Sequence, residues 1–270
     1  MKERAIRLVV SYDGTGFGGW QRQKNARSVQ EELEKALEKM HDHPVRLTGA
    51  GRTDAGVHAL GQVAGFFTDI VSIPAGKFLP ALNQLLPRDI RIVAAGDAPP
   101  DFHARFDASL RKYRYFILCG DAQDAFSQRY AWHVSRQPSI GKLNAMASVI
   151  AGEHDFSAFA SAKDISLSKC RFIQDSSFWF EGGKLVYQVS ANAFLWRMVR
   201  SLVGTMLFFE PKCGDEKDAA FLMKSILESR DRKRAGPTAP PQGLFLWNVE
   251  YGPRNHGHAK RSQEDSPAVD

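Results

Sequence analysis

The stretch Arg4-Ala5-Ile6-Arg7-Leu8-Val9-Val10-Ser11-Tyr12 begins the fold. Apolar side chains stand at every second position from Ile6 to Tyr12, and this alternation is typical of a strand with one buried face. A glycine-rich turn occupies 13–19. The run Ser28-Val29-Gln30-Glu31 then has the pattern of a capping box, in which serine and glutamate satisfy free backbone N–H groups at a helix start. We therefore expect a strand here, followed by a helix that begins at the capping box.

The order strand, helix, strand, strand, helix, strand is expected before Pro99-Pro100, and a similar order with one further helix is expected after it. The expected elements lie at 4–12, 29–40, 44–48, 62–67, 74–86 and 90–93, and then at 113–119, 140–151, 171–180, 184–191, 195–209, 215–229 and 244–251. This order predicts an α+β fold of two ferredoxin-like halves with antiparallel sheets, joined side by side with an active-site cleft between them.

The expected division of the chain follows from these elements. Residues 1–104 form an N-terminal α+β domain, and residues 105–252 form a C-terminal α+β domain. From residue 253 to residue 270 the chain is polar and has few bulky apolar residues, so we expect a disordered tail.

Composition limits the kind of protein. The 36 Lys and Arg exceed the 30 Asp and Glu, and the net charge of +6 suits a polyanionic partner without proving one. No run of about eighteen apolar residues exists, so we expect no membrane span. The N-terminus has no apolar signal core, and we expect a cytoplasmic protein. The 3 cysteines stand far apart, which argues against a disulfide framework.

Two patterns resemble ligand sites but fit them poorly. Gly14-x-Gly16-x-x-Gly19 matches a dinucleotide fingerprint, which needs a helix directly after the glycines to hold the pyrophosphate, whereas Trp20-Gln21-Arg22-Gln23 follows here. No cysteine or carboxylate lies at a convincing ligand spacing from the paired histidines, which are His41, His43, His256 and His258. We therefore expect neither a cofactor nor a metal.

The densest chemical pattern is the loop Gly49-Ala50-Gly51-Arg52-Thr53-Asp54-Ala55-Gly56-Val57-His58-Ala59-Leu60-Gly61. Arg52 and Asp54 stand two apart, so they point to the same side if the segment is extended, and an arginine near a carboxylate holds it in one orientation. A surface turn capped by Asp54 would explain an isolated Arg-x-Asp. The many glycines, the lone His58 and the small residues around it favour a functional site.

This loop resembles the catalytic segment of the TruA family of tRNA pseudouridine synthases, and further segments between residues 6 and 251 resemble the family's other signatures in the expected order. These segments are Tyr12-Asp13-Gly14 with Gly19-Trp20-Gln21-Arg22-Gln23, Asp101-Phe102-His103-Ala104-Arg105-Phe106, Arg111-Lys112-Tyr113-Arg114-Tyr115, His154-Asp155-Phe156-Ser157-Ala158-Phe159, Asn192-Ala193-Phe194-Leu195 with Met198-Val199-Arg200, and Gly236-Pro237-Thr238-Ala239-Pro240-Pro241 with Gly243-Leu244-Phe245-Leu246.

The resemblance implies a cofactor-free isomerase, a homodimeric tRNA pseudouridine(38-40) synthase that acts at positions 38, 39 and 40 of the anticodon stem-loop. Asp54 is then the catalytic carboxylate, and Arg52 lies near the flipped nucleotide. Tyr113 stacks on the flipped uracil, and Leu246 forms an apolar wall of the pocket. Arg200 matches the partner of the carboxylate. Its place in an apolar helix also demands a carboxylate, because a buried guanidinium needs an opposite charge.

Two basic clusters are the expected contacts to RNA. Arg105, Arg111 and Arg114 stand close to Tyr113, and Arg232 lies in a basic run at 230–234. One or two cations at a helix end complement its dipole, and a larger number suggests phosphate contact as well. Such side chains would position tRNA through its backbone.

Two other functions remain open from the residues alone. A non-catalytic tRNA-binding module would use the basic clusters without forming a modified nucleoside, and a nucleosidase would use Asp54 to release free base. For the isomerase, Asp54 has three possible roles: addition to the uracil ring, attack at the ribose C1′, or removal of a ribose proton. The sequence does not choose among these, nor does it say which tRNAs are modified.

Overall fold

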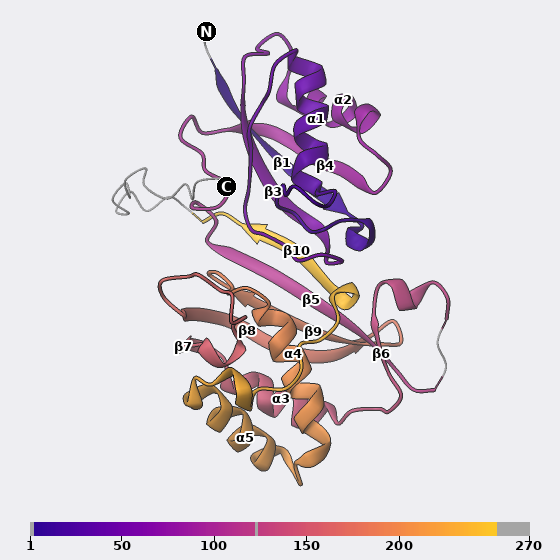
Figure 1. Ribbon diagram of the computed structural model, residues 1–270, viewed down its shortest axis with the longest axis vertical. Helices are drawn as coiled ribbons and strands as arrows, with labels where there is room; N and C mark the ends of the chain where they lie inside the picture. The colour runs from indigo at the N-terminus through magenta and orange to yellow at the C-terminus, as the bar shows by residue number, and fades with distance from the viewer. Residues whose placement is uncertain (1–2, 122–123, 253–270) are drawn as a thin grey trace.

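One continuous sheet of ten strands runs through the computed structural model, which describes residues 3–121 and 124–252 (Figure 1). The strands are β1 (Arg4–Tyr12), β2 (Leu47–Gly49), β3 (His58–Thr68), β4 (Ile90–Ala98), β5 (Leu110–Cys119), β6 (Trp132–Val134), β7 (Gly152–Asp155), β8 (Cys170–Glu181), β9 (Lys184–Ala191) and β10 (Leu244–Glu250). Their order is β4-β1-β3-β10-β5-β9-β8-β7, with β2 beside β3 and β6 beside β5.

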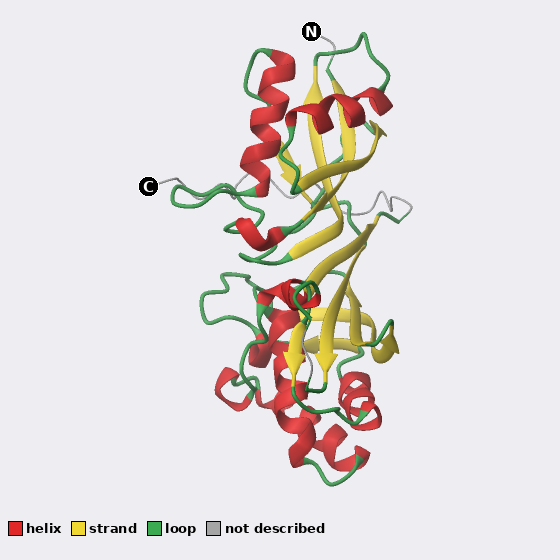
Figure 2. Ribbon diagram, turned by 90° about the vertical axis from the view of Figure 1, so that its right-hand side faces the viewer, coloured by secondary structure: helices red, strands yellow, loops and turns green. Residues whose placement is uncertain are grey.

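The helices gather at the two ends of this sheet. They are α1 (Val29–His41), α2 (Phe78–Leu85), α3 (Ile140–Val149), α4 (Met198–Phe209) and α5 (Glu216–Ser229). The first two lie beside the strands of the N-terminal half, and α3, α4 and α5 lie beside those of the C-terminal half (Figures 1 and 2). Leu33 of α1, Leu82 of α2 and Ile6 of β1 are fully buried, so the alternation of β1 does mark the face that packs against helices. Within the described residues, no helix has the length and apolar character needed to cross a membrane.

The last strand joins the two halves. β10 pairs with β3 in parallel and with β5 in the antiparallel sense, and Leu246 lies opposite both Ala59 and Tyr113. The α+β fold is therefore confirmed, and the strands of both halves belong to one sheet. Most pairings are antiparallel, and β10–β3 and β5–β6 are the parallel exceptions among the described strands. The boundary expected at 104/105 falls between β4 and β5, and it stays a prediction.

The structure agrees with the local sequence patterns at some element boundaries and differs from them at others. The Ser28 hydroxyl accepts a hydrogen bond from the Glu31 N–H (3.4 Å) at the start of α1, as the capping pattern predicts. The expectation that the glycine-rich loop extends to Gly61 is wrong, because β3 begins at His58. Gly61 lies where β10 comes so close that a Cβ atom would stand 2.5 Å from the Trp247 carbonyl oxygen. The tail expected at 253–270 lies outside the described residues.

Candidate active site

The backbone around Asp54 is fixed by the glycine-rich turn after β1. The Trp20 N–H donates to the Thr53 carbonyl oxygen (3.1 Å), and Gly19 forms a β-bridge with Asp54. Gly19 has a φ of 112°, and a Cβ atom there would stand 2.5 Å from the Thr53 carbonyl oxygen, so only glycine fits. The Tyr12 and Thr53 hydroxyls lie 2.8 Å apart. The turn that resembles a nucleotide fingerprint thus supports the Asp54 loop.

His58 supports the same loop from inside the protein. It is only 1% exposed, its Nδ1 accepts a hydrogen bond from the Gly14 N–H (3.0 Å), and its ring stacks on Phe245 at 4.6 Å. Burial lowers the pKa of His58, while the negative charge of Asp13 acts in the opposite direction. We therefore assign His58 to bracing the loop.

The carboxylate of Asp54 reaches the other half of the protein. Its Oδ2 accepts a hydrogen bond from Arg200 Nη1 (2.7 Å), and its Oδ1 accepts one from Trp196 Nε1 (2.8 Å). The side chains of Asp54 and Arg200 are 18% and 12% exposed, so this ion pair is mostly buried. The structure therefore brings together the carboxylate and the arginine that the sequence paired.

Arg200 also holds the segment before β10. Its Nε donates to the Ala239 carbonyl oxygen (2.8 Å), and the Ala239 N–H donates back to the Arg200 carbonyl oxygen (3.0 Å). Asp54, α4 and the 236–240 segment therefore meet at one guanidinium.

Tyr113 and Leu246 are the residues that the sequence predicts for the apolar part of the site. They lie opposite each other on β5 and β10, at 8% and 0% exposure, and the Phe194 ring packs edge-on against Tyr113 at 5.1 Å. Burial raises the pKa of Tyr113 well above its usual range. Arg111 opposes this shift, and the negative charge of Asp54 adds to it. The Tyr113 hydroxyl therefore keeps its proton at neutral pH.

Arg52 and Trp196 differ from what the sequence suggests. Arg52 is exposed, and its Nε donates to Gln21 Oε1 (3.0 Å), so it lies at the edge of the site and not on Asp54. Trp196 is not among the site residues predicted from the sequence. The helix expected from residue 195 begins only at Met198, so Trp196 precedes α4 and its spacing of four from Arg200 is not a helical spacing in the structure.

The expectation that Arg111 contacts RNA is not supported. Arg111 is only 8% exposed, and its guanidinium donates to four backbone carbonyl oxygens, those of Ala50 (3.0 Å), Ala108 (2.8 Å), Asn192 (2.6 Å) and Arg105. Ala50 belongs to the N-terminal half and Asn192 to the C-terminal half. Arg111 therefore ties the halves together, and both of its Nη atoms donate to backbone carbonyl oxygens.

Arg111→Met should lower the free energy of unfolding by about 3 kcal/mol, because buried carbonyl oxygens lose their donor. Urea unfolding measures this loss, and the tRNA affinity of the folded variant should stay within about twofold. Arg105→Met is the matched control. Arg105 is exposed, so its loss should change stability by less than about 0.5 kcal/mol and reduce the salt dependence of tRNA binding by about one counterion. Weaker tRNA binding by Arg111→Met at unchanged stability would contradict this assignment.

The other two arginines are also engaged by the protein. Arg114 alternates with Tyr113 on β5, so it faces the opposite side of the sheet, where it lies 4.1 Å from the Trp247 ring centroid. Arg232 donates to the Gly236 carbonyl oxygen (3.0 Å) and to the Thr238 hydroxyl (3.0 Å). Arg232 therefore helps to shape the segment that carries Ala239.

This segment packs directly on the backbone of α4. A Cβ atom on Gly204 would stand 1.9 Å from the Pro237 carbonyl oxygen, and the Gly236 N–H donates to the buried Thr205 hydroxyl (3.0 Å). Gly204→Ala should therefore lower the free energy of unfolding by about 2 kcal/mol, although alanine is the better helix former. The matched control is Gly76→Ala, because a Cβ there meets nothing within 4 Å. Equal thermal stability of the two variants would contradict this packing.

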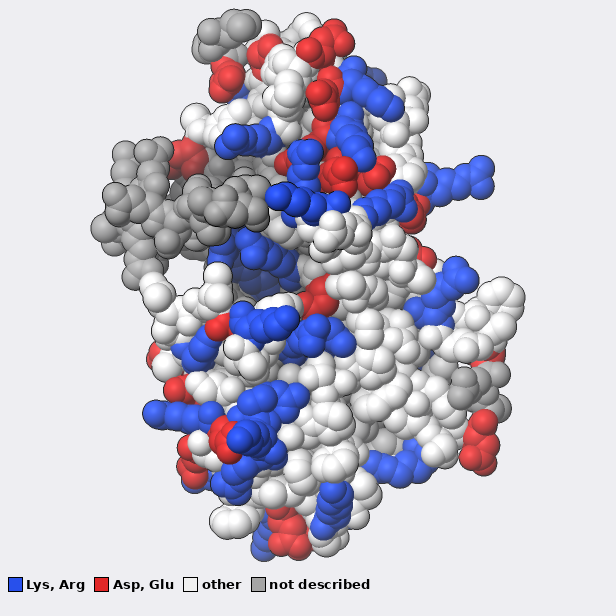
Figure 3. All heavy atoms as spheres, viewed as in Figure 1, with Lys and Arg blue, Asp and Glu red and all other residues white. Residues whose placement is uncertain are grey.

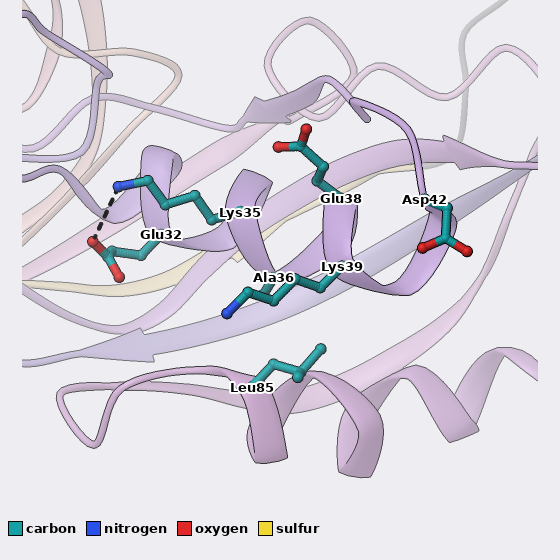
Figure 4. A pocket seen from close by; sticks show the side chains of 7 residues that line it. All are labelled: Glu32, Lys35, Ala36, Glu38, Lys39, Asp42 and Leu85. Atoms are coloured by element: carbon teal, nitrogen blue, oxygen red, sulfur yellow. Dashed lines mark ion pairs between the residues drawn. The ribbon is translucent and has the colours of Figure 1, made fainter.

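Other surface features do not extend this site. A pocket of about 450 Å³ between α1 and α2 is lined by charged side chains, with Lys35 and Glu32 3.9 Å apart, and none of its lining residues lies around Asp54 (Figure 4). No group of three potential metal ligands occurs among the described residues, and His256 and His258 lie outside them.

Lys and Arg side chains gather across the middle of one face, between the two halves (Figure 3).

Known proteins resemble this chain over nearly its whole length. A family model described as tRNA pseudouridine synthase matches residues 8–107 and 146–252. The tRNA pseudouridine synthase A of Treponema denticola is 52% identical over 254 residues, which cover 92% of this chain and 93% of that protein. The corresponding enzyme of Treponema pallidum (strain Nichols) is 46% identical over 264 residues (96% and 92%), and that of Halalkalibacterium halodurans is 42% identical over 267 residues (98% of each).

A distant solved structure also overlaps this chain. It belongs to the archaeal box H/ACA sRNP Nop10-Cbf5 complex, with a TM-score of 0.32 and 13% identity over 85% of this chain and 59% of that chain. The close relatives are matched over more than nine-tenths of their length, and the family model matches residues in both halves. The chain therefore belongs to the tRNA pseudouridine synthase family.

Proposed function

We propose that this protein converts uridine to pseudouridine at positions 38, 39 and 40 in the anticodon stem-loop of tRNAs, as a cytoplasmic homodimer without cofactor or metal. The observation that carries the proposal is the Asp54 carboxylate between the two halves, with Arg200 on one oxygen and Trp196 on the other. The names of the close relatives, tRNA pseudouridine synthase A, support the same reaction.

The reaction exchanges one bond at the ribose C1′ for another. The N1–C1′ bond of uridine breaks, the uracil turns within the site, and C1′ bonds to C5. The proton on C5 leaves and N1 gains a proton, so the product is an isomer of the substrate. A carboxylate serves this exchange by adding to the ring, by bonding to C1′ or by removing a ribose proton. All three roles need Asp54 beside the target nucleoside.

The remaining side chains bind and orient the base. The target uridine must leave its stack in the RNA before Asp54 can reach it. Tyr113 offers a ring for the flipped uracil and a protonated hydroxyl for a hydrogen bond, and Leu246 closes the apolar side. Arg52 and Arg105 are exposed and would contact phosphates near the flipped nucleotide, with Arg232 as a further contact. These roles form part of the proposal.

The test is the fate of the uracil. Purified protein should release tritium from tRNA that carries 5-tritiated uracil, and pseudouridine at positions 38, 39 and 40 should disappear from the tRNA of cells that lack the protein. Tight tRNA binding without any modified nucleoside would indicate a binding module, and release of free uracil would indicate a nucleosidase. Either result would contradict the isomerase. A solution mass near 30.1 kDa, that of one chain, would contradict the homodimer.

A further inference from the structure

The two hydrogen bonds to Asp54 act on different oxygens. Arg200 Nη1 holds Oδ2 at 2.7 Å, and Trp196 Nε1 holds Oδ1 at 2.8 Å. A carboxylate held at one oxygen still rotates about its Cβ–Cγ bond, because this torsion has no sharp minima. A second donor on the other oxygen fixes the plane of the carboxylate. Each oxygen also keeps a lone pair for the substrate.

Trp196 is itself held from both sides of its backbone. Its N–H donates to Asp164 Oδ2 (2.6 Å), and its carbonyl oxygen accepts a hydrogen bond from the Ser161 N–H (3.0 Å). The Asp164 side chain is 4% exposed and is paired with Lys169. Burial opposes the ionisation of Asp164, but hydrogen bonds from Lys169, Trp196 and Ser166 lower its pKa to about 2. The Asp164 carboxylate, which accepts the hydrogen bond from the Trp196 backbone N–H, therefore stays charged at neutral pH.

The indole is not placed as a core residue would be. Trp196 is 41% exposed, although it stands next to Leu195, which is only 3% exposed. The following residue, Arg197, has a φ of 63°, a left-handed conformation that non-glycine residues rarely adopt. This turn directs the chain into α4, so that Trp196 before it and Arg200 after it both reach Asp54.

We propose that Trp196 is a positioning residue for Asp54, and that its indole N–H fixes the plane of the carboxylate before the uridine enters. This inference rests on the proposed function, since it deepens the role of the same site. A carboxylate that is already oriented loses less freedom on reaching the transition state, so Trp196 speeds the chemical step and adds little to tRNA binding.

The test is Trp196→Phe, which keeps a flat ring and removes the N–H donor. Loss of a hydrogen bond to a charged group should slow single-turnover tritium release on the order of ten- to a hundredfold, with the Kd for tRNA within about twofold. The matched control is Trp179→Phe. The Trp179 indole also donates to a carboxylate, Glu181 Oε2 at 2.9 Å, but on β8. This control should keep the wild-type rate.

A second measurement does not depend on catalysis. The chain has 5 tryptophans, so the indole N–H resonances of the 15N-labelled protein are few, and Trp196→Phe identifies one of them. Asp54→Asn should shift the Trp196 resonance and leave that of Trp179 in place. A wild-type rate for Trp196→Phe, a rate loss matched by an equal loss of tRNA affinity, or an unmoved resonance would each overturn the inference. If the wild-type protein makes no pseudouridine, the proposed function fails, and the resonance still tests the contact.

Discussion

Asp54→Asn is expected to stop pseudouridine formation while the protein still folds and binds tRNA. The amide has the size of the carboxylate and still accepts a hydrogen bond from Arg200, but it is neither a nucleophile nor a base at neutral pH. Tritium release from 5-tritiated uracil in tRNA should therefore fall on the order of 10³-fold or more, to the background of the assay. The Kd for tRNA should change by less than about threefold, because Asp54 contributes no phosphate contact.

A matched aspartate separates this effect from a general loss of charge. Asp89 pairs with Arg27 at 2.7 Å, and the two side chains are 32% and 37% exposed. Asp89→Asn should keep turnover within about twofold, since an exposed ion pair contributes little to stability. Turnover by Asp54→Asn within tenfold of the wild-type rate would remove Asp54 from the chemistry.

The long elements of this fold are predictable because their own side chains carry the pattern. β1 alternates from Ile6 to Tyr12, and α1 begins directly after Ser28, where the capping pattern places it. β6 and β7 have three and four residues and form because β5 and β8 lie beside them. A run of three or four residues is too short to show the alternation of buried and exposed side chains that distinguishes a strand from a loop.

A contact within the site can be predicted from the sequence only where a buried charged side chain needs a partner of opposite charge. A guanidinium in an apolar helix needs a carboxylate, and the contact between Arg200 and Asp54 follows that demand. Strand alternation also places Arg111 on the same face of β5 as Tyr113, which already indicates an inward side chain. Two of its four carbonyl partners, Ala50 and Asn192, lie 61 and 81 residues away in sequence. The contact of Trp196 depends on a left-handed turn that no periodicity predicts.

Arg200→Met is expected to damage both stability and turnover. Methionine keeps an apolar stem but cannot donate to Asp54 or to the Ala239 carbonyl oxygen, so a mostly buried carboxylate is left without its cation. Removing one partner of a buried ion pair should cost about 4 kcal/mol in the free energy of unfolding. Tritium release should fall on the order of a hundredfold at temperatures where the variant is folded, because Trp196 alone does not fix the carboxylate.

A double-mutant cycle shows whether the cost comes from the unpaired charge of Asp54. In the Asp54→Asn background, Arg200→Met should cost about 2 kcal/mol less than in the wild-type protein, because no carboxylate is then left without a cation. Arg27→Met is the control for losing an arginine from an exposed pair, and it should cost about 1 kcal/mol or less. Additive losses in the cycle would mean that Arg200 stabilises the protein only through Ala239. The ion pair between the halves would then orient Asp54 without contributing to the stability of the fold.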